Sequence, residues 1–157
     1  MQDTIQELQE IVSTYERKFS AIAEHDFSSK PNPAKWSKKE VVGHLIDSGQ
    51  NNLRRFICGQ YESVPPKIKY EQDFWVIANG YQSATQHDVI QLWKLVNNRI
   101  VAILSAMPKE NYTKACDFGK ETPELRTLEW LAEDYVKHLK HHTNQVIPGS
   151  FDIKYPS

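Results

Sequence analysis

The sequence contains little cysteine, and its two cysteines lie far apart. Cys58 and Cys116 occur in separate segments of the 157-residue chain, without the spacing of a metal site. A chain of this length can bury a core without disulfides or a structural metal, and sparse cysteine is typical of proteins from a reducing compartment. We therefore expect two free thiols in a cytoplasmic protein, in which any bound metal serves function before structure.

Long apolar runs and an excess of one charge are also missing. No segment approaches the roughly 20 apolar residues that span a bilayer, and residues 1–8 lack the basic start and apolar stretch of a signal sequence. The 19 basic and 20 acidic side chains leave a net charge of -1, with no long run of either sign. The sequence therefore predicts neither a membrane partner nor a nucleic-acid partner.

The sequence lacks a strand pattern but carries a helical one. Apolar and polar residues do not alternate over enough positions to build a sheet, and there is no internal repeat or low-complexity tract. Instead, apolar residues recur at steps of three and four, which is typical of amphipathic helices. This period runs through residues 5–22, 37–56, 89–107 and 127–146.

Local signals mark the ends of these helices. Ser37 followed by Glu40 forms a capping-box pattern, with Trp36 before it as the hydrophobic staple. Pro108 ends the third helix, and the Pro-Gly pair at residues 148–149 ends the fourth. These signals support four separate helices.

Two long connections join the helices. Residues 58–84 include a short helix expected around residues 73–78, and this connection should pack over one end of the bundle or form a lid. Residues 108–126 form the other connection and have mixed polarity. We therefore predict one all-α domain over residues 1–157, a four-helix bundle with a long crossover between its second and third helices.

Two histidines on the fourth predicted helix have a spacing that suits metal binding. His138 and His142 are four residues apart, so both imidazoles project from one face about one turn apart. The helical wheel places them in or beside the apolar arc, pointing toward the core. A shared cation would satisfy both rings. The alternative is a pair of neutral core histidines bonded to hydroxyls or carbonyls.

A third histidine could join this pair. His44 lies at the flank of the apolar face of the second helix, where a half-buried, hydrogen-bonded histidine is ordinary. Together with His138 and His142, however, it would complete a three-histidine site for Zn²⁺, Ni²⁺ or a related ion, with positions open for water or substrate. A metal with three protein ligands keeps a coordination position open, which is typical of a catalytic metal and not of a structural one.

Two acids lie close to these candidate ligands. Asp47 and Asp134 are one helical turn from His44 and His138, a spacing that suits an acceptor for a ring N–H. A solvated acid is the common alternative for each.

The remaining histidines and the crossover aromatics are weaker candidates. His141 points about 100° away from its neighbour, so we expect a surface or outer role for it, and Gln145 lies at the edge of the apolar arc. His25 and His87 lie near helix ends and are expected at the surface. Four aromatic residues of the crossover could line a pocket, or they could simply fill the core. They are Tyr70, Phe74, Trp75 and Tyr81.

Two blocks of the sequence resemble the signature regions of a known family. Residues 35–47, KWSKKEVVGHLID, and residues 135–146, YVKHLKHHTNQV, are similar to the two motifs of the DinB-like superfamily, which includes the YfiT-like metal-dependent hydrolases. Motif order, separation and chain length also agree. The resemblance implies a four-helix bundle with a long crossover and a divalent metal held by His44, His138 and His142. Gln145 matches a glutamine that is frequent in the family pattern.

The activity implied by this resemblance is broader. Relatives include S-transferases that use bacillithiol or similar low-molecular-weight thiols, a mycothiol-dependent maleylpyruvate isomerase and proteins with only a hydrolase label. Their common chemistry would be a metal that lowers the pKa of a bound thiol or water. We therefore expect a metal-dependent thiol S-transferase or hydrolase acting on a small molecule, with a low-molecular-weight thiol as candidate cosubstrate. The sequence assigns no general acid or base.

Two other functions stay open. The chain could be a non-catalytic protein that binds a metal or small molecule, or a helical interaction module whose histidines only pack and bind no metal. An exposed apolar helix face would also allow a homodimer, which the sequence alone does not establish.

Overall fold

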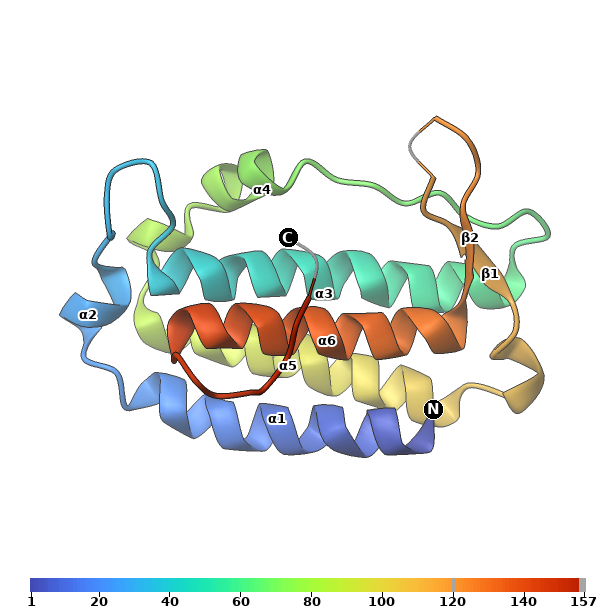
Figure 1. Ribbon diagram of the computed structural model, residues 1–157, viewed down its shortest axis with the longest axis horizontal. Helices are drawn as coiled ribbons and strands as arrows, with labels where there is room; N and C mark the ends of the chain where they lie inside the picture. The colour runs from blue at the N-terminus through green and yellow to red at the C-terminus, as the bar shows by residue number, and fades with distance from the viewer. Residues whose placement is uncertain (120, 156–157) are drawn as a thin grey trace.

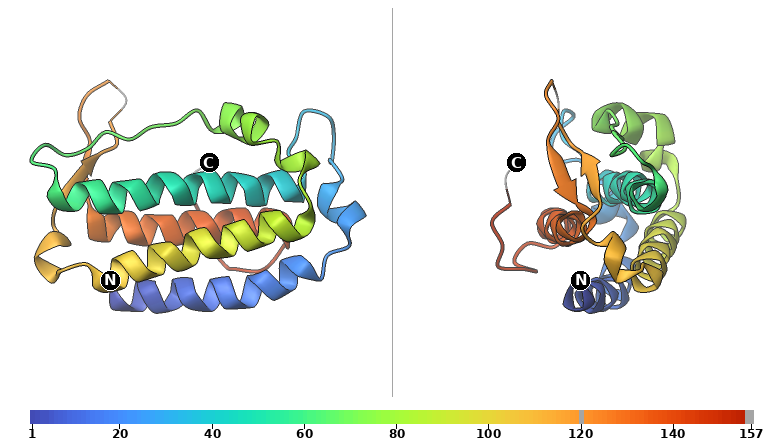
Figure 2. Two further views of the ribbon diagram at one scale, coloured as in Figure 1. Left: turned by 180° about the vertical axis from the view of Figure 1, so that it is seen from behind. Right: turned by 90° about the vertical axis from the view of Figure 1, so that its right-hand side faces the viewer.

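The computed structural model describes residues 1–119 and 121–155, and four long helices dominate it (Figure 1). Helix α3 packs against α5 and α6, and α1 packs against the same two helices, so α1 and α3 occupy opposite corners of the bundle (Figure 2). This architecture confirms the predicted all-α four-helix bundle. The long helices are α1 (Gln2–Ser20), α3 (Lys38–Tyr61), α5 (Gln86–Ala106) and α6 (Leu128–Val146).

Short elements fill the connections. A small helix, α2 (Glu24–Ser28), follows α1, and the crossover contains α4 (Gln72–Asn79) and the 3-10 turn η1 (Tyr81–Ser83). A second 3-10 turn, η2 (Lys109–Asn111), follows α5. The short helix expected around residues 73–78 is therefore confirmed as α4.

The predicted start of the second long helix is confirmed at atomic detail. The Ser37 hydroxyl accepts the backbone N–H of Glu40 at 3.1 Å, and the Glu40 carboxylate accepts the backbone N–H of Ser37 at 2.8 Å. This reciprocal capping box satisfies two backbone donors that a helix end would otherwise leave free. Because the start of α3 is fixed, the direction of each later side chain on that helix is fixed as well.

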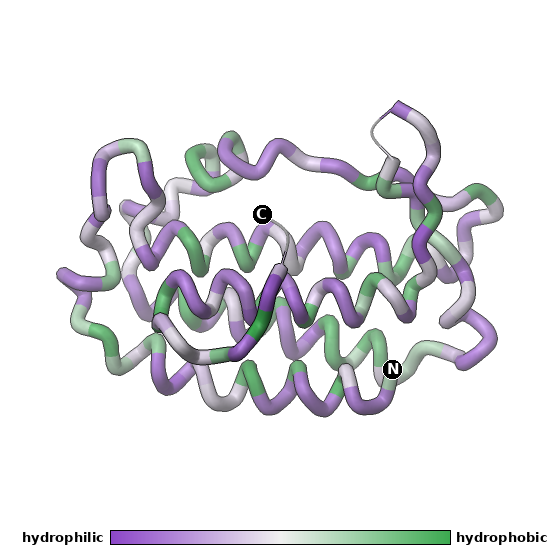
Figure 3. Tube along the Cα trace, in the orientation of Figure 1, coloured by the Kyte–Doolittle hydropathy of each residue, from purple (hydrophilic) through white to green (hydrophobic). Residues whose placement is uncertain are grey.

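Apolar side chains from all four long helices meet inside the bundle. Hydrophobic and hydrophilic positions alternate along each helix at the helical period (Figure 3). Fully buried members include Phe19 of α1, Leu45 of α3, Trp93 of α5 and Leu139 of α6. Burial of each such side chain contributes about 1.5–3 kcal/mol. The predicted periodicity therefore corresponds to the observed core.

The crossover runs along the outside of α3, over the face away from α1 (Figures 1 and 2). Arg55 of α3 holds its first part, donating from Nε and Nη2 to the carbonyl oxygen of Ile68 at 3.1 and 2.5 Å. Tyr81 holds its last part through a hydrogen bond to Asp47. The segment therefore packs along the side of α3 (Figures 1 and 2), whereas the sequence predicted that it would pack over one end of the bundle or form a lid.

The connection before α6 contains a small sheet that the sequence did not predict. Strand β1 (Ala115–Asp117) pairs with β2 (Leu125–Thr127) in antiparallel register, with Cys116 opposite Arg126. Strands of three residues are too short to display an alternating pattern. The Asp117 carboxylate organises the turn by accepting the backbone N–H groups of Gly119 and Glu124 at 2.8 and 2.9 Å.

The residues after α6 fold back across that helix (Figure 1). Asn144 fixes this tail with two hydrogen bonds of 2.9 Å to the backbone of Phe151. Both cysteines are free thiols, as predicted. Within the described residues, no helix is both long and apolar enough to cross a membrane.

Candidate metal centre

The structure brings His44, His138 and His142 together. Each offers one ring nitrogen, and the three nitrogens lie within 4.8 Å of one another. His44 Nε2 of α3 is 3.3 Å from His138 Nε2 of α6, across 94 positions of sequence. The centroids of the His138 and His142 rings are 4.4 Å apart, as their four-residue spacing on one helix predicts. These are the three residues that the sequence predicted as ligands.

Outer hydrogen bonds orient two of the three rings. Nδ1 of His142 lies 2.9 Å from Oε1 of Gln145, and Nδ1 of His138 lies 3.5 Å from the hydroxyl of Ser48. Since an amide oxygen only accepts, His142 carries its proton on Nδ1, which leaves the Nε2 lone pair free. With the Nδ1 atoms engaged outward, the Nε2 atoms are available to a shared ion.

Burial keeps the three imidazoles neutral. It lowers the pKa of His44 to about 3, with a smaller contribution from His142. Burial also holds the pKa of His138 well below its usual value, with the other histidines acting in the same direction, and lowers the pKa of His142. Neutral imidazole is the form that binds metal. At neutral pH each ring therefore has one nitrogen with a free lone pair, which can bind a metal.

The donor set fits a divalent transition metal. Imidazole nitrogens suit zinc, copper, iron and nickel, and three protein ligands leave a coordination position for another molecule. A shared cation would also satisfy one nitrogen of each ring at once. Binding of the ion itself stays a prediction, as does the preference for zinc or nickel.

The two acids near the triad do not contact the ligand rings. Oδ1 of Asp47 accepts the Tyr81 hydroxyl at 2.6 Å and the Asn79 amide at 2.9 Å. Both carboxylate oxygens of Asp134 lie 3.1 Å from the hydroxyl of Tyr155. These contacts match neither predicted role, which was an acceptor for a histidine ring or a solvated acid. The donors to Asp47 come from the crossover, and the donor to Asp134 comes from the tail. Burial raises the pKa of Asp47 to about 6, while the Tyr81 hydrogen bond lowers it.

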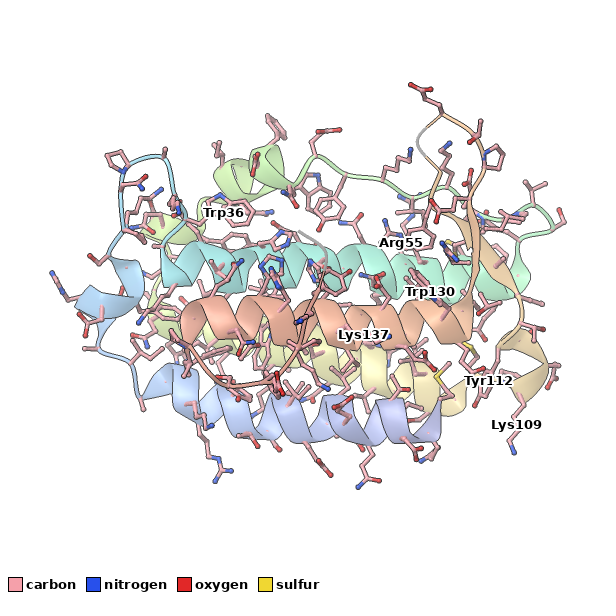
Figure 4. All side chains as sticks on the ribbon, in the orientation of Figure 1. Trp36, Arg55, Lys109, Tyr112, Trp130 and Lys137 are labelled. Carbon is pink, nitrogen blue, oxygen red and sulfur yellow. The ribbon has the colours of Figure 1, made fainter. Side chains whose placement is uncertain are left out.

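Residues around the triad include one that the sequence analysis missed. Ser48 lies four positions after His44 on the same helical face, a spacing that could have identified it. The ring of Trp36 lies over His44 with centroids 5.1 Å apart, and Figure 4 shows Trp36 at the start of α3 on the side of the crossover. His141 contacts the Gln145 amide nitrogen at 3.3 Å, which agrees with the outer role predicted for it. Gln145 thereby gains a structural role as the link between two histidines.

The weaker candidates have mixed outcomes. His25 and His87 are exposed, as predicted. Tyr70 is half-buried and interacts with Ser48, beside the triad, whereas Phe74 is 69% exposed. Tyr81 is buried against Asp47, and Trp75 packs on Tyr70 with centroids 5.3 Å apart.

A groove of about 580 Å³ adjoins the triad. Trp36 and Gln145, which contact two of the candidate ligands, form part of its wall. Lys35 lines it from the loop before α3, Lys38 from the first residue of α3, and Asp73 from α4. None of the three histidines lines this groove, and none lines a larger hollow of about 660 Å³ between α1 and α6. The smaller groove is assigned to the site because its wall residues Trp36 and Gln145 contact His44 and His142.

Comparisons with known proteins agree with the fold and the motifs. YfiT of Bacillus subtilis, which bears the name "Putative metal-dependent hydrolase YfiT", is 24% identical over 138 residues, covering 88% of this chain and 77% of YfiT. The solved structure of YfiT, described as having an unusual four-helix bundle topology, matches with a TM-score of 0.72 at 20% identity over 92% of this chain and 86% of that one.

A second solved structure shares the fold, and a family model covers most of the chain. The structure of a mycothiol-dependent maleylpyruvate isomerase matches with a TM-score of 0.73 at 8% identity, over 90% of this chain but 59% of that one. The model of the DinB superfamily matches residues 7–146. Because this match includes all three histidines and nearly the whole bundle, the chain belongs to the DinB superfamily.

Proposed function

We propose that this protein is a divalent-metal-dependent enzyme that acts on a small molecule at the His44, His138 and His142 cluster, as a thiol S-transferase or, in the alternative, as a hydrolase. One observation carries the proposal: three neutral imidazoles, one buried and two half-buried, converge within 4.8 Å beside an open groove. A bound ion would supply Lewis acidity, which lowers the pKa of a thiol or a water and so makes a nucleophile at neutral pH.

The chain's own residues would hold this centre rigid. His138 and His142 are carried on one helix and His44 on its neighbour, so their relative positions follow from the packing of α3 on α6. Gln145 and Ser48 fix the outer nitrogens of two rings. Sites built on packed helices with supporting hydrogen bonds keep their geometry better than sites on loops.

The groove beside the cluster supports a small-molecule substrate. Its volume of about 580 Å³ falls in the range typical of small-molecule sites. Trp36 and Val41 give it apolar wall, and Lys35 and Lys38 place two cations at its edge. A ligand with an apolar part and a carboxylate would suit these walls.

The choice between thiol and water rests on the relatives. The fold is shared with an isomerase named for its dependence on mycothiol, which supports a thiol as cosubstrate. The YfiT name supports hydrolysis. A low-molecular-weight thiol is our first choice, because the metal would activate its sulfur as readily as a water and the groove has room for it.

Metal content is the experiment that tests the proposal. Elemental mass spectrometry of tag-free protein should find about one divalent ion per chain, lost in both His44→Ala and His138→Ala. The exposed His87 offers the matched control, since His87→Ala should keep the ion. Wild-type protein that takes up neither Zn²⁺ nor Ni²⁺ would refute the proposal. With metal established, turnover of electrophiles that depends on added thiol separates the transferase from the hydrolase.

A further inference from the structure

Two buried polar atoms on α3 lack partners although their residues are one helical turn apart. In the described part of the chain, four buried side-chain nitrogen or oxygen atoms have no hydrogen-bond partner, and two of them are His44 Nδ1 and Asp47 Oδ2. The residues are 1% and 0% exposed. An unpaired buried donor or acceptor destabilises a protein and is rare in folded structures. Each atom therefore needs an explanation.

The tautomer expected for His44 makes the two atoms complementary. Its Nε2 lies 3.3 Å from Nε2 of His138, inside the histidine cluster. An imidazole whose Nε2 lone pair binds a metal carries its proton on Nδ1. Nδ1 of His44 is then a donor, and Oδ2 of Asp47 is a carboxylate oxygen that accepts.

Asp47 is held in place from the crossover. Tyr81 and Asn79 both donate to its Oδ1, at 2.6 and 2.9 Å, so one oxygen takes two donors and the other takes none. The Tyr81 ring fits because residue 43 is glycine: a Cβ on Gly43 would lie 2.1 Å from Cδ2 of that ring. The missing side chain one position before His44 thus allows the crossover to reach Asp47 and orient it.

We infer that Asp47 is the positioning residue of His44, and that its Oδ2 accepts the Nδ1–H of His44 when the cluster holds its ion. The inference rests on the metal site proposed above. The two atoms are not bonded in the present conformation, so the inferred contact requires a rotation of one side chain or a buried water between them. Ser48 and Gln145 give the other two rings neutral partners. Asp47 gives His44 an anionic one, which orients the ring and raises its basicity.

Zinc affinity tests this role, measured by competition with a chromophoric chelator. In Asp47→Asn, the donors of Tyr81 and Asn79 occupy the single amide oxygen, so the NH₂ group faces Nδ1 of His44 and two donors oppose each other. We expect zinc affinity to fall by about 10- to 100-fold. Asp134→Asn is the matched control, because Asp134 is also one turn from a candidate ligand but bonds Tyr155 with both oxygens. Equal zinc affinity in wild type and Asp47→Asn overturns the inference.

Nitrogen-15 NMR of the zinc-loaded wild type adds a readout that does not depend on how Asp47→Asn folds. His44 should bind zinc through Nε2 and keep a slowly exchanging proton on Nδ1. Tyr81→Phe removes one hydrogen bond from Asp47 and should speed that exchange. Zinc bound through Nδ1 of His44, or an exchange rate unchanged by Tyr81→Phe, overturns the inference and leaves the metal site standing. A wild type that binds no zinc overturns the proposed function itself.

Discussion

The seam between α1 and α5 and the seam between α3 and α6 lie in one bundle but contain different chemistry. In the first, the fully buried rings of Phe19 and Trp93 meet edge to face with centroids 5.2 Å apart. In the second, His44 faces His138 at 3.3 Å, with Asp47 buried beside it. Apolar burial stabilises a fold, whereas polar burial without full pairing destabilises it. The first seam therefore supports the structure, and the second lowers stability, a cost that the proposed metal site would explain.

The largest effect should come from the apolar seam. Phe19→Ala removes a fully buried ring that packs on Tyr15 and Trp93, and it should lower the free energy of unfolding by about 3–5 kcal/mol. Urea unfolding of metal-free protein measures this loss. Leu95→Ala, at a side chain 62% exposed, is the control and should change stability little. A similar loss in both variants would show that the α1–α5 seam is not the stabilising one.

Bound zinc should raise the free energy of unfolding by satisfying the polar groups between α3 and α6. Zinc at a free concentration 100 times its Kd should raise the free energy of unfolding by about 2.7 kcal/mol, since it binds the folded state. Chemical unfolding with zinc and with a chelator measures the difference. Phe19→Ala should show the same increment, because it leaves the α3–α6 seam intact. His142→Ala should show none, and an equal increment in that variant would mean that zinc binds elsewhere.

The long helices and the short hairpin differ in how well the sequence predicts them. The helices were predictable because apolar spacing alone reports the helical period, and the cap at Ser37 and Glu40 marked one start. The hairpin of β1 and β2 was not, because strands of three residues carry no period and depend on the Asp117 carboxylate that organises their turn. Short elements held by tertiary contacts leave little local signal.

The histidines of the site were predictable, but their surroundings were not. His138 and His142 share a face by helical spacing, and His44 was a candidate from its place on the second helix before the family motif supported it. The partner of Asp47, however, is Tyr81, 34 positions away on the crossover. The partner of Asp134 is Tyr155, 21 positions away on the tail. Spacing within one helix cannot reveal donors that arrive from other segments, so the sequence did not predict the tyrosine partners of the two acids.

A fall in pH should weaken the polar seam of the metal-free protein. His44 has a pKa of about 3 in the folded state and about 6.5 when unfolded, so the unfolded chain binds the extra proton. Stability is therefore full above pH 6.5 and is lost as pH falls toward 3, by at most about 1.4 kcal/mol per pH unit for this residue. Asp47, whose pKa is raised to about 6, acts in the opposite direction between about pH 4 and 6.

A comparison of variants isolates the histidine. His44→Leu should show a shallower loss of stability between pH 7 and pH 5 than wild type, by urea unfolding in chelator. The side chain of His25 is 90% exposed, so His25→Leu should keep the wild-type slope. If His44→Leu kept that slope as well, the imidazole of His44 would not be the group held neutral by burial.

The smallest effect distinguishes a metal ligand from a core histidine. In metal-free protein, His138→Leu should change the free energy of unfolding by less than about 1 kcal/mol, or raise it, because leucine removes the desolvation cost of the ring and fills much of its space. The hydrogen bond that the ring makes through Nδ1 to the Ser48 hydroxyl is long, at 3.5 Å, so its removal should cost little. Zinc uptake should disappear in the same variant. A core histidine with satisfied hydrogen bonds would behave otherwise: its loss would destabilise the protein by about 1–3 kcal/mol with no change in zinc content.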